Sequence, residues 1–248
     1  MLIEFSRHDA ELLAAACTGA STDANRPILE AINLEWSVGT EHGTPERVRD
    51  DEGVVVTDED GNPVYGPAPV GLKIEAVCTD SYVLTCRTFV WSDGTGFALE
   101  DGDTDTEGNF LVPAKLLRQA ILDVIKHVGN HGPADLQTVI LAFDDQHVEV
   151  SNMTGSFHQR IRFVEGNFPN WRNLLPDADT EADLEFVGLN ASYIAKIAKA
   201  MDAKVMTKSY NYPIRLAVQT ALKPIIYRQP GVNGSDSEFF ALQMPVRL

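Results

Sequence analysis

The side chains that most often carry out chemistry are present in this sequence, but they form no recognisable catalytic pattern. Six histidines are scattered over 248 residues, and only His127 and His131 stand four positions apart. Two histidines at that spacing on one helix could hold zinc, but Gly129 between them is expected to end the helix. No nucleophile elbow, phosphate-binding glycine loop or zinc spacing occurs. The sequence therefore predicts a protein that is not an enzyme and needs no cofactor.

An acidic stretch at residues 92–109 resembles the start of a calcium loop, with Asp103, Asp105 and Glu107 at alternate positions. The twelfth position of such a loop must be a glutamate, and here it is Ala114. We expect a solvated acidic loop and no metal site.

The three cysteines, Cys17, Cys78 and Cys86, are odd in number and lack the CxxC spacing of metal sites. We expect them to be reduced packing residues of a cytosolic protein rather than disulfide partners. The acidic residues near the start of the chain argue against a signal peptide, and no apolar run is long enough to span a membrane.

The net charge of −16 argues against a simple nucleic-acid coat, because phosphate binding needs clustered cations. The cations are nevertheless unevenly placed. Seven of the twenty lie on or just after two predicted helices: Lys115, Arg118, Lys126, Lys196, Lys199, Lys204 and Lys208. A basic stripe on a common surface is one interpretation, and ordinary outward-facing lysines are the other. The first helix weakens the stripe, since Arg7 is opposed by Asp9 and Glu11.

The predicted elements alternate between short helices and antiparallel strands. The clearest helix is residues 113–128, in which Leu117, Ile121, Val124, Ile125 and Val128 form one apolar face. In a further helix, residues 191–204, we expect Ile194, Ile197, Ala198, Met201 and Val205 to face inward. A first helix covers residues 9–17, and the predicted strands are residues 2–5, 28–38, two within 71–91, 138–143, 147–151, 158–164, 183–190, 213–219, 224–228 and 238–247.

This order, strand–helix–three strands, occurs three times, over residues 1–91, 109–166 and 183–248. A helix that covers the apolar face of an antiparallel sheet predicts an α+β fold. We divide the chain into a domain at 1–176, with two units, and a single unit at 177–248. Residues 39–69 are rich in Asp, Glu, Gly and Pro, so we expect an exposed insertion with a hairpin turn at 60–62.

Five phrases resemble, in order, the bacterial sliding clamp family, the beta processivity subunits of replicative DNA polymerases. VCTDSYVL (77–84) is similar to the family's VATDGHRLA turn, and LVPAKLLRQAI (111–121) to its VPRK-type helix start. VEGNFPNWRNLLP (164–176) resembles DGRFPDYRRVLP, and GLNASYIAKIAKA (188–200) resembles GFNVSYLLDVLNA. The closing QMPVRL (243–248) is similar to the family's terminal MPMRL. The clamp's first domain, and the first half of its third, have no counterpart.

The resemblance implies a DNA-clamp fold, with sheets outside and helices inside, and a groove that receives short linear peptides. Such peptides carry a Gln followed by Leu and Phe anchors. Carried over by position, the groove residues are Thr79, Ser81, Tyr82, Val83, Leu84, Pro176, Met244, Pro245, Val246, Arg247 and Leu248. An apolar chain end is tolerable if it lines such a groove. Tyr82 and Val83 replace the family's His and Arg, so peptide preference is expected to differ.

The resemblance also implies an oligomeric ring around duplex DNA, held without sequence specificity. The expected DNA-facing residues are Arg7, Lys115, Arg118, Lys126, Lys196, Lys199 and Lys204. The implied partners are duplex DNA, a replicative polymerase, a clamp loader and further copies of the chain, in a bacterial or phage-infected cytoplasm and away from membranes. A shortened, phage-type clamp would suit the abbreviated architecture. The alternative is a clamp-like protein that binds the peptides as a regulator or decoy without encircling DNA.

Overall fold

The computed structural model describes residues 1–49, 54–58, 60–99, 106–128, 137–175, 189–201, 215–218, 223–229 and 238–245. Within this part of the chain, the helices are α1 (Arg7–Ala16), α2 (Ala114–Val128) and α3 (Ala191–Ala200), with short 3-10 turns η1 (Cys17–Gly19), η2 (Thr40–His42) and η4 (Trp171–Leu174). The strands are β1 (Leu2–Phe5), β2 (Ala31–Gly39), β3 (Gly71–Thr79), β4 (Val83–Trp91), β5 (Phe97–Ala98), β6 (Glu107–Pro113), β7 (Val139–Phe143), β8 (His147–Asn152), β9 (His158–Arg162), β10 (Arg215–Ala217), β11 (Ile225–Gln229) and β12 (Glu238–Gln243).

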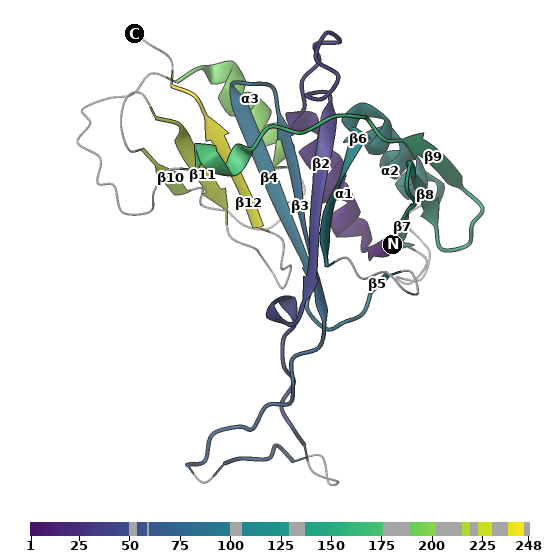
Figure 1. Cartoon of the computed structure of the whole chain (residues 1–248), viewed down its shortest axis with the longest axis vertical. Coiled ribbons are helices and arrows are strands. Elements are labelled where there is room, and N and C mark those ends of the chain that lie inside the picture. Colours follow the sequence, from purple (N-terminus) through teal and green to yellow (C-terminus); the bar gives the residue numbers. More distant parts are fainter. Residues whose placement is uncertain are drawn as a thin grey trace.

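Two antiparallel sheets organise the molecule (Figure 1). The smaller sheet has the order β5-β1-β7-β8-β9, and the larger has the order β10-β11-β12-β4-β3-β2-β6. The first two units exchange their first strands, because β1 pairs with β7 and β6 pairs with β2. The third unit continues the sheet of the first, because β12 pairs with β4. The predicted α+β class is confirmed.

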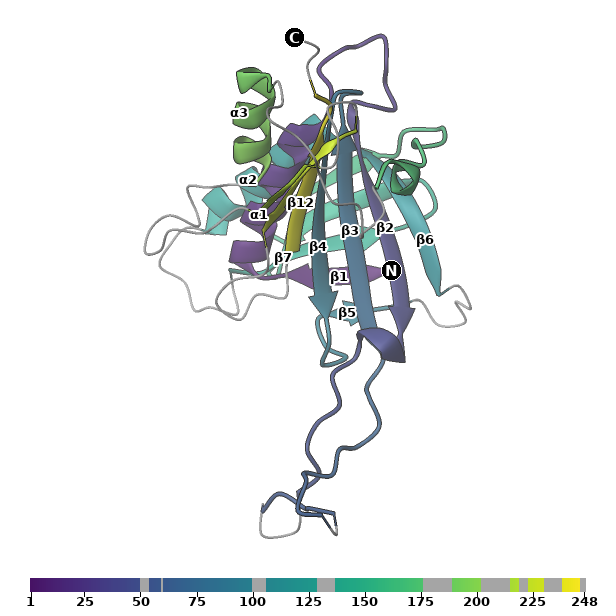
Figure 2. The ribbon, with the colours of Figure 1, turned by 90° about the vertical axis from the view of Figure 1, so that its left-hand side faces the viewer.

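The helices lie on one face of the larger sheet, and this face holds the main core (Figure 2). Along β2, Ile32, Leu34 and Trp36 alternate inward, whereas Asn33 and Glu35 point to the other face. The inward residues join side chains from α1, α2 and the smaller sheet in one cluster. A second cluster joins α3 to β4, β11 and β12. The larger sheet therefore has a covered inner face and an outer face that is free to carry a site.

The helix ends follow local rules. The Ser6 side chain caps α1 by accepting a hydrogen bond from the Asp9 N–H at 3.1 Å, and Asn190 caps α3 through the Ser192 N–H at 2.9 Å. The apolar face predicted for α2 is buried, apart from a half-buried Val128. The prediction for α3 is wrong at Ile194, which is 39% exposed, because the helix packs through Ile197, Ala200 and Met201.

Some predicted boundaries shift. The strand expected at 28–38 begins at Ala31, because the preceding residues form hydrogen-bonded turns onto Arg26. The acidic stretch is not loop throughout, since it contains β5 and the start of β6. The strand expected at 183–190 lies mostly outside the described residues, and so do residues 202–204 at the end of the helix expected at 191–204.

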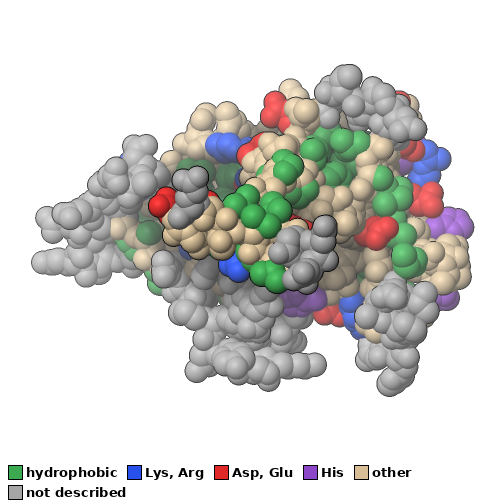
Figure 3. Space-filling view, turned by 90° about the horizontal axis from the view of Figure 1, so that it is seen from below, with side chains coloured by type: hydrophobic (Ala, Val, Ile, Leu, Met, Phe, Trp, Pro, Cys, Tyr) green, Lys and Arg blue, Asp and Glu red, His purple; other side chains and the backbone are tan. Residues whose placement is uncertain are grey.

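Between β2 and β3 the chain leaves the body as a long arm, residues 43–70 (Figure 1). Its backbone closes a cycle of hydrogen bonds of 2.9 Å, in which Val48 donates to Val64, Val64 to Val56, and Val56 to Val48. The hairpin turn predicted at 60–62 is confirmed, with Gly61 at φ +82°. None of the arm's described residues is buried. Figure 3 views the molecule from below, from the side on which the arm projects, and shows hydrophobic side chains near the centre of this face.

Candidate functional site

The turn between β3 and β4 is held in one conformation by its own side chains. The Asp80 carboxylate accepts hydrogen bonds from the N–H groups of Tyr82 (2.9 Å) and Val83 (2.8 Å). The Thr79 hydroxyl donates to the Val83 carbonyl at 2.9 Å. Ser81 occupies the left-handed region at φ +81°, which is uncommon for a residue other than glycine. The turn is therefore a rigid element that presents Tyr82 outward.

The end of β12 lies directly beside this turn. Leu242 pairs with Leu84, and Gln243 with Val83. One residue further, the Met244 N–H donates to the Tyr82 carbonyl at 3.0 Å. The structure thus brings together the described groove residues predicted from the two segments, Thr79–Leu84 and Met244–Pro245. Pro176, Val246, Arg247 and Leu248 lie outside the described residues.

The outer face of the larger sheet has an apolar floor next to this junction. The buried side chains of Val77, Leu84, Cys86, Trp171, Ile226 and Leu242 form it, with Phe240 packed against them. Trp171 covers the floor, and its ring centroid lies 5.5 Å from that of Phe240. Trp171 belongs to a segment that we call the strap, residues 165–175, which crosses the outer face.

Around this floor the chain leaves several large apolar side chains exposed. Tyr82 is 57% exposed, Leu174 49%, Met244 39% and Leu175 37%. Tyr82 stacks on Tyr193 of α3, with ring centroids 5.8 Å apart and an interplanar angle of 12°. We call the exposed side chains of Tyr82, Leu174, Leu175 and Met244 the apolar rim. Tyr193, against which Tyr82 stacks, is half-buried against the cluster on the inner face. Exposed apolar side chains beside a buried apolar floor are typical of a surface that binds another polypeptide.

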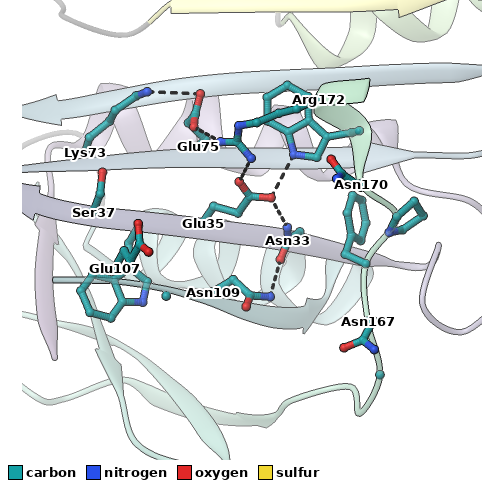
Figure 4. A pocket seen from close by; sticks show the side chains of 16 residues that line it. Asn33, Glu35, Ser37, Lys73, Glu75, Glu107, Asn109, Asn167, Asn170 and Arg172 are labelled. Carbon is teal, nitrogen blue, oxygen red and sulfur yellow. Dashed lines mark hydrogen bonds and ion pairs between the residues drawn. The ribbon is translucent and has the colours of Figure 1, made fainter. Parts of the chain in front are cut away.

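The strap also borders a polar pocket of about 770 Å³ over β6, β2 and β3 (Figure 4). In Figure 4 the carboxylates of Glu35 and Glu75 converge on Arg172 of the strap, and both form ion pairs with it. Burial alone would lower the pKa of Arg172, but the hydrogen bond and charge of Glu35, together with Glu75, raise it. Arg172 therefore stays charged while it ties the strap to the sheet.

The predicted DNA-facing cations lie in different environments. Lys115 and Lys126 of α2 and Lys199 of α3 are exposed, and Arg118 is half-buried. Arg7 pairs with Glu11 at 3.1 Å, one helical turn further along α1. Lys204 lies outside the described residues.

Lys196 is engaged by the turn itself. Its ammonium donates to the Asp80 carboxylate at 2.6 Å and to the Ala20 carbonyl at 3.1 Å. Burial alone would raise the pKa of Asp80, but the hydrogen bonds from Lys196, Val83 and Tyr82 outweigh it and lower that pKa. Lys196 thus links α3 to the 79–83 turn beside the apolar rim.

The cysteines considered for metal or redox chemistry lie in surroundings that indicate a packing role. The three cysteines are buried and unbridged, and burial raises the pKa of Cys17 to about 12. Among the described residues no group of His, Cys, Asp and Glu could hold a metal ion. Asp103, Asp105 and His131 are not described. No helix in the described part of the chain is long and apolar enough to cross a membrane.

Sequence reasoning missed four residues that build or support this surface. Tyr193 was treated only as part of a helix and of a resembling phrase, Leu174 and Leu175 only as part of a resembling phrase, and Glu35 only as part of a strand. Their contacts join positions more than 100 residues apart, such as Tyr82 with Tyr193 and Glu35 with Arg172. The unbroken Leu174-Leu175 pair, three positions after Trp171 and outside any predicted strand, was the available signal.

The exchanged strands, the inner helices and the sheet shared between units define the DNA-clamp fold, and comparison with solved structures identifies it. The beta chain of DNA polymerase III from Streptococcus pneumoniae matches the whole chain with a TM-score of 0.57 at 14% identity. The sliding clamp of Bacillus subtilis gives 0.56 at 15%. That of Bartonella birtlesii, solved with griselimycin bound, gives 0.59 at 16%.

The chain has the fold of bacterial sliding clamps over its whole length, but it is shorter than they are. It spans 65%, 64% and 66% of these three chains, respectively. No family model matches the sequence. No curated protein matches it either.

Proposed function

We propose that this protein is a sliding clamp, a non-enzymatic processivity factor that encircles duplex DNA and tethers a replicative polymerase, and a clamp loader, through short peptides. The observation that carries the proposal is the junction of the Met244 N–H with the Tyr82 carbonyl. It completes a surface with a buried apolar floor and an exposed apolar rim, on a fold similar along its whole length to those of sliding clamps.

The apolar rim suits a peptide with two apolar anchors. Hydrophobic anchors supply most of the binding energy when they fill a desolvated pocket. Tyr82, which stacks on Tyr193, presents an exposed aromatic ring at the 79–83 turn, and Met244 adds an adaptable apolar side chain. Because the turn is internally hydrogen-bonded, the surface is preorganised and little ordering cost is expected on binding.

The helices supply the proposed DNA-facing surface. The exposed cations Lys115, Lys126 and Lys199 lie on helices, on the side of the larger sheet away from the apolar floor. Phosphate contacts of this kind are independent of sequence and weaken with salt. In a closed ring such weak contacts suffice, since DNA cannot leave without ring opening. With three units per chain, closure requires further copies.

One observation favours a second candidate, a clamp-like protein that binds the peptides without encircling DNA. Arg7 and Lys196, two of the seven cations assigned to the DNA-facing surface, are engaged by carboxylates of the same chain. A surface with fewer cations available to DNA phosphates would bind DNA more weakly. Retention on nicked circular DNA, lost when the circle is linearised, supports the ring. Equal retention on both forms, or none, supports the second candidate.

The peptide surface is tested by fluorescence anisotropy with a labelled peptide that carries Gln followed by Leu and Phe anchors. Leu174→Asp and Met244→Ala should each weaken binding at least tenfold, since both remove apolar rim contacts. Met153→Asp is the matched control, because Met153 is 48% exposed but lies after β8 in the smaller sheet. Affinity unchanged by all three substitutions would remove this surface from the account.

A further inference from the structure

The strap divides the outer face of the larger sheet into two chemically different halves. On one side lies the apolar floor over β4, β12 and β11. On the other lies the polar pocket over β6, β2 and β3. Trp171 and Arg172, adjacent in the sequence, face one half each: the indole is buried in the floor at 2% exposure, and the guanidinium reaches the polar pocket.

Glu35 is the point at which the two halves meet. One of its carboxylate oxygens accepts hydrogen bonds from the Asn33 side-chain amide (2.8 Å) and from the Trp171 indole N–H (2.9 Å). The other oxygen pairs with Arg172, whose second nitrogen pairs with Glu75. A single side chain on β2 thus holds two consecutive strap residues.

The carboxylate itself is fixed from behind. The side-chain amide of Asn109 on β6 donates to the side-chain oxygen Oδ1 of Asn33 at 3.0 Å, and the side-chain amide nitrogen of Asn33 donates to Glu35. On β3, the Lys73 Nζ lies 3.4 Å from the Glu75 Oε1. The row Asn109–Asn33–Glu35–Arg172–Glu75–Lys73 therefore runs across three strands and includes the strap (Figure 4). Linked charge-assisted bonds of this kind fix geometry more than isolated surface pairs do.

The position of Trp171 determines where the apolar rim stands. Trp171 begins η4, and Leu174 and Leu175 follow within one turn. The indole N–H bond to Glu35 fixes the ring's orientation in the floor, and the stacking of Arg172 over that ring at 4.3 Å adds a second restraint. A strap released at Glu35 would keep its apolar contacts but lose the bond that orients η4.

We propose that Glu35, supported by Glu75, is a positioning residue for the apolar rim: it holds the strap through Trp171 and Arg172 and so places Leu174 and Leu175 for peptide binding. This inference rests on the proposed peptide-binding function. It gives the polar pocket a supporting role in peptide binding, in which the pocket positions the strap and does not touch the peptide.

The test compares Glu35→Gln and Glu35→Ala with Glu107→Gln as the matched control. Glu107 lines the same pocket, and among the described residues it makes no ion pair with the strap. Two quantities are measured on the full chain: hydrogen exchange of the amides in residues 166–175, and affinity for the labelled Leu/Phe-anchored peptide. The melting temperature is followed in parallel to separate positioning from loss of fold.

Glu35→Ala should speed exchange of the strap amides and weaken peptide binding about tenfold, mainly through faster dissociation. Glu35→Gln, which keeps the shape but loses the charge, should weaken it about threefold at an unchanged melting temperature. Glu107→Gln should change neither. Combining Glu35→Gln with Arg172→Met should cost less than the sum of the two single changes, because both break the same ion pair.

Strap exchange unchanged in both Glu35 variants would overturn the inference, and so would a loosened strap with unchanged peptide affinity. If the unsubstituted protein binds no peptide, the proposed function fails instead. The exchange data then still decide whether Glu35 positions the strap. Glu35→Gln is nearly isosteric with the native side chain, so the test survives if Glu35→Ala does not fold.

Discussion

At the scale of single residues, Arg87 is the least expected member of the structure. It lies on β4 with no exposed surface, donates a hydrogen bond to the Met201 carbonyl at 3.0 Å, and places its guanidinium 4.9 Å from the centre of the Phe239 ring. Met201 is the C-cap of α3, where a cation is favoured by the helix dipole. Arg87 therefore joins the third unit to the first.

Arg87→Ala should lower the free energy of unfolding by about 3 kcal/mol, because it leaves a cavity and an unsatisfied helix-end carbonyl. Arg87→Met should cost less than half of that, since it fills the volume and removes a buried charge. Urea denaturation of both variants measures the difference. Equal losses, or no loss with alanine, would contradict this account of the residue.

The Asp80–Lys196 pair makes a pH-dependent contribution. The folded-state pKa of Asp80 is lowered, so its stabilisation is fully present above the unfolded-state pKa and is lost as the pH falls through the folded-state value, below 3.8. Asp80→Asn should therefore cost about 1 kcal/mol at pH 7 and progressively less below pH 4. Urea midpoints measured from pH 7 to pH 3 check this. A constant difference across that range would show that ionisation of Asp80 is not responsible.

At the scale of elements, the sequence predicts those helices and buried faces that depend on the local spacing of apolar residues. The apolar spacing of α2 predicts both the helix and its buried face, because the helix packs along its whole length. The same reasoning fails at Ile194, since α3 packs through one edge only and leaves this side chain exposed. The nearness of Met244 to Tyr82 followed only from a resemblance, because pairing of β12 with β4 joins residues 150 or more positions apart. Periodicity carries no information about such pairing.

The Trp171–Glu35 bond lies beyond sequence reasoning for a related reason. Outward-facing polar residues on a strand are expected on any half-solvated sheet, so Asn33 and Glu35 look ordinary. Their role depends on a strap that returns to the sheet more than 130 residues later. Only the folded structure reveals that return.

The arm is an element whose removal should leave the body intact, because none of its described residues is buried. The Gly66 N–H donates to the Glu46 carbonyl at 2.9 Å, which is the bond that closes a two-residue hairpin. Replacing residues 47–65 with Asn-Gly should therefore change the melting temperature by less than about 3 °C. Calorimetry measures this. A large decrease would mean that the arm stabilises the body.

At the scale of the whole molecule, charge is distributed by layer. The net charge is −16, yet the exposed positions of α2 and α3 carry Lys115, Lys126 and Lys199. Arg160 and Arg162 lie instead on β9, on the side opposite the buried Ile161, and each faces a carboxylate of its own sheet region. The lysines on the helices and the arginines on β9 thus have the same charge but different surroundings. Each group can be reversed in charge by a double substitution, and the two double variants form a matched pair.

Lys115→Glu with Lys199→Glu, and Arg160→Glu with Arg162→Glu, each replace two positive charges by two negative ones, so both take the net charge from −16 to −20. If DNA passes along the helices, the double lysine variant should shorten retention on nicked circular DNA about tenfold or more at low salt. The double arginine variant should have little effect, because electrostatic repulsion acts over only about 10 Å at 0.1 M salt. Retention half-lives measured at two salt concentrations separate a local effect from a net-charge effect. Equal losses in the two variants would show that total charge, and not the helix-lined surface, controls the association with DNA.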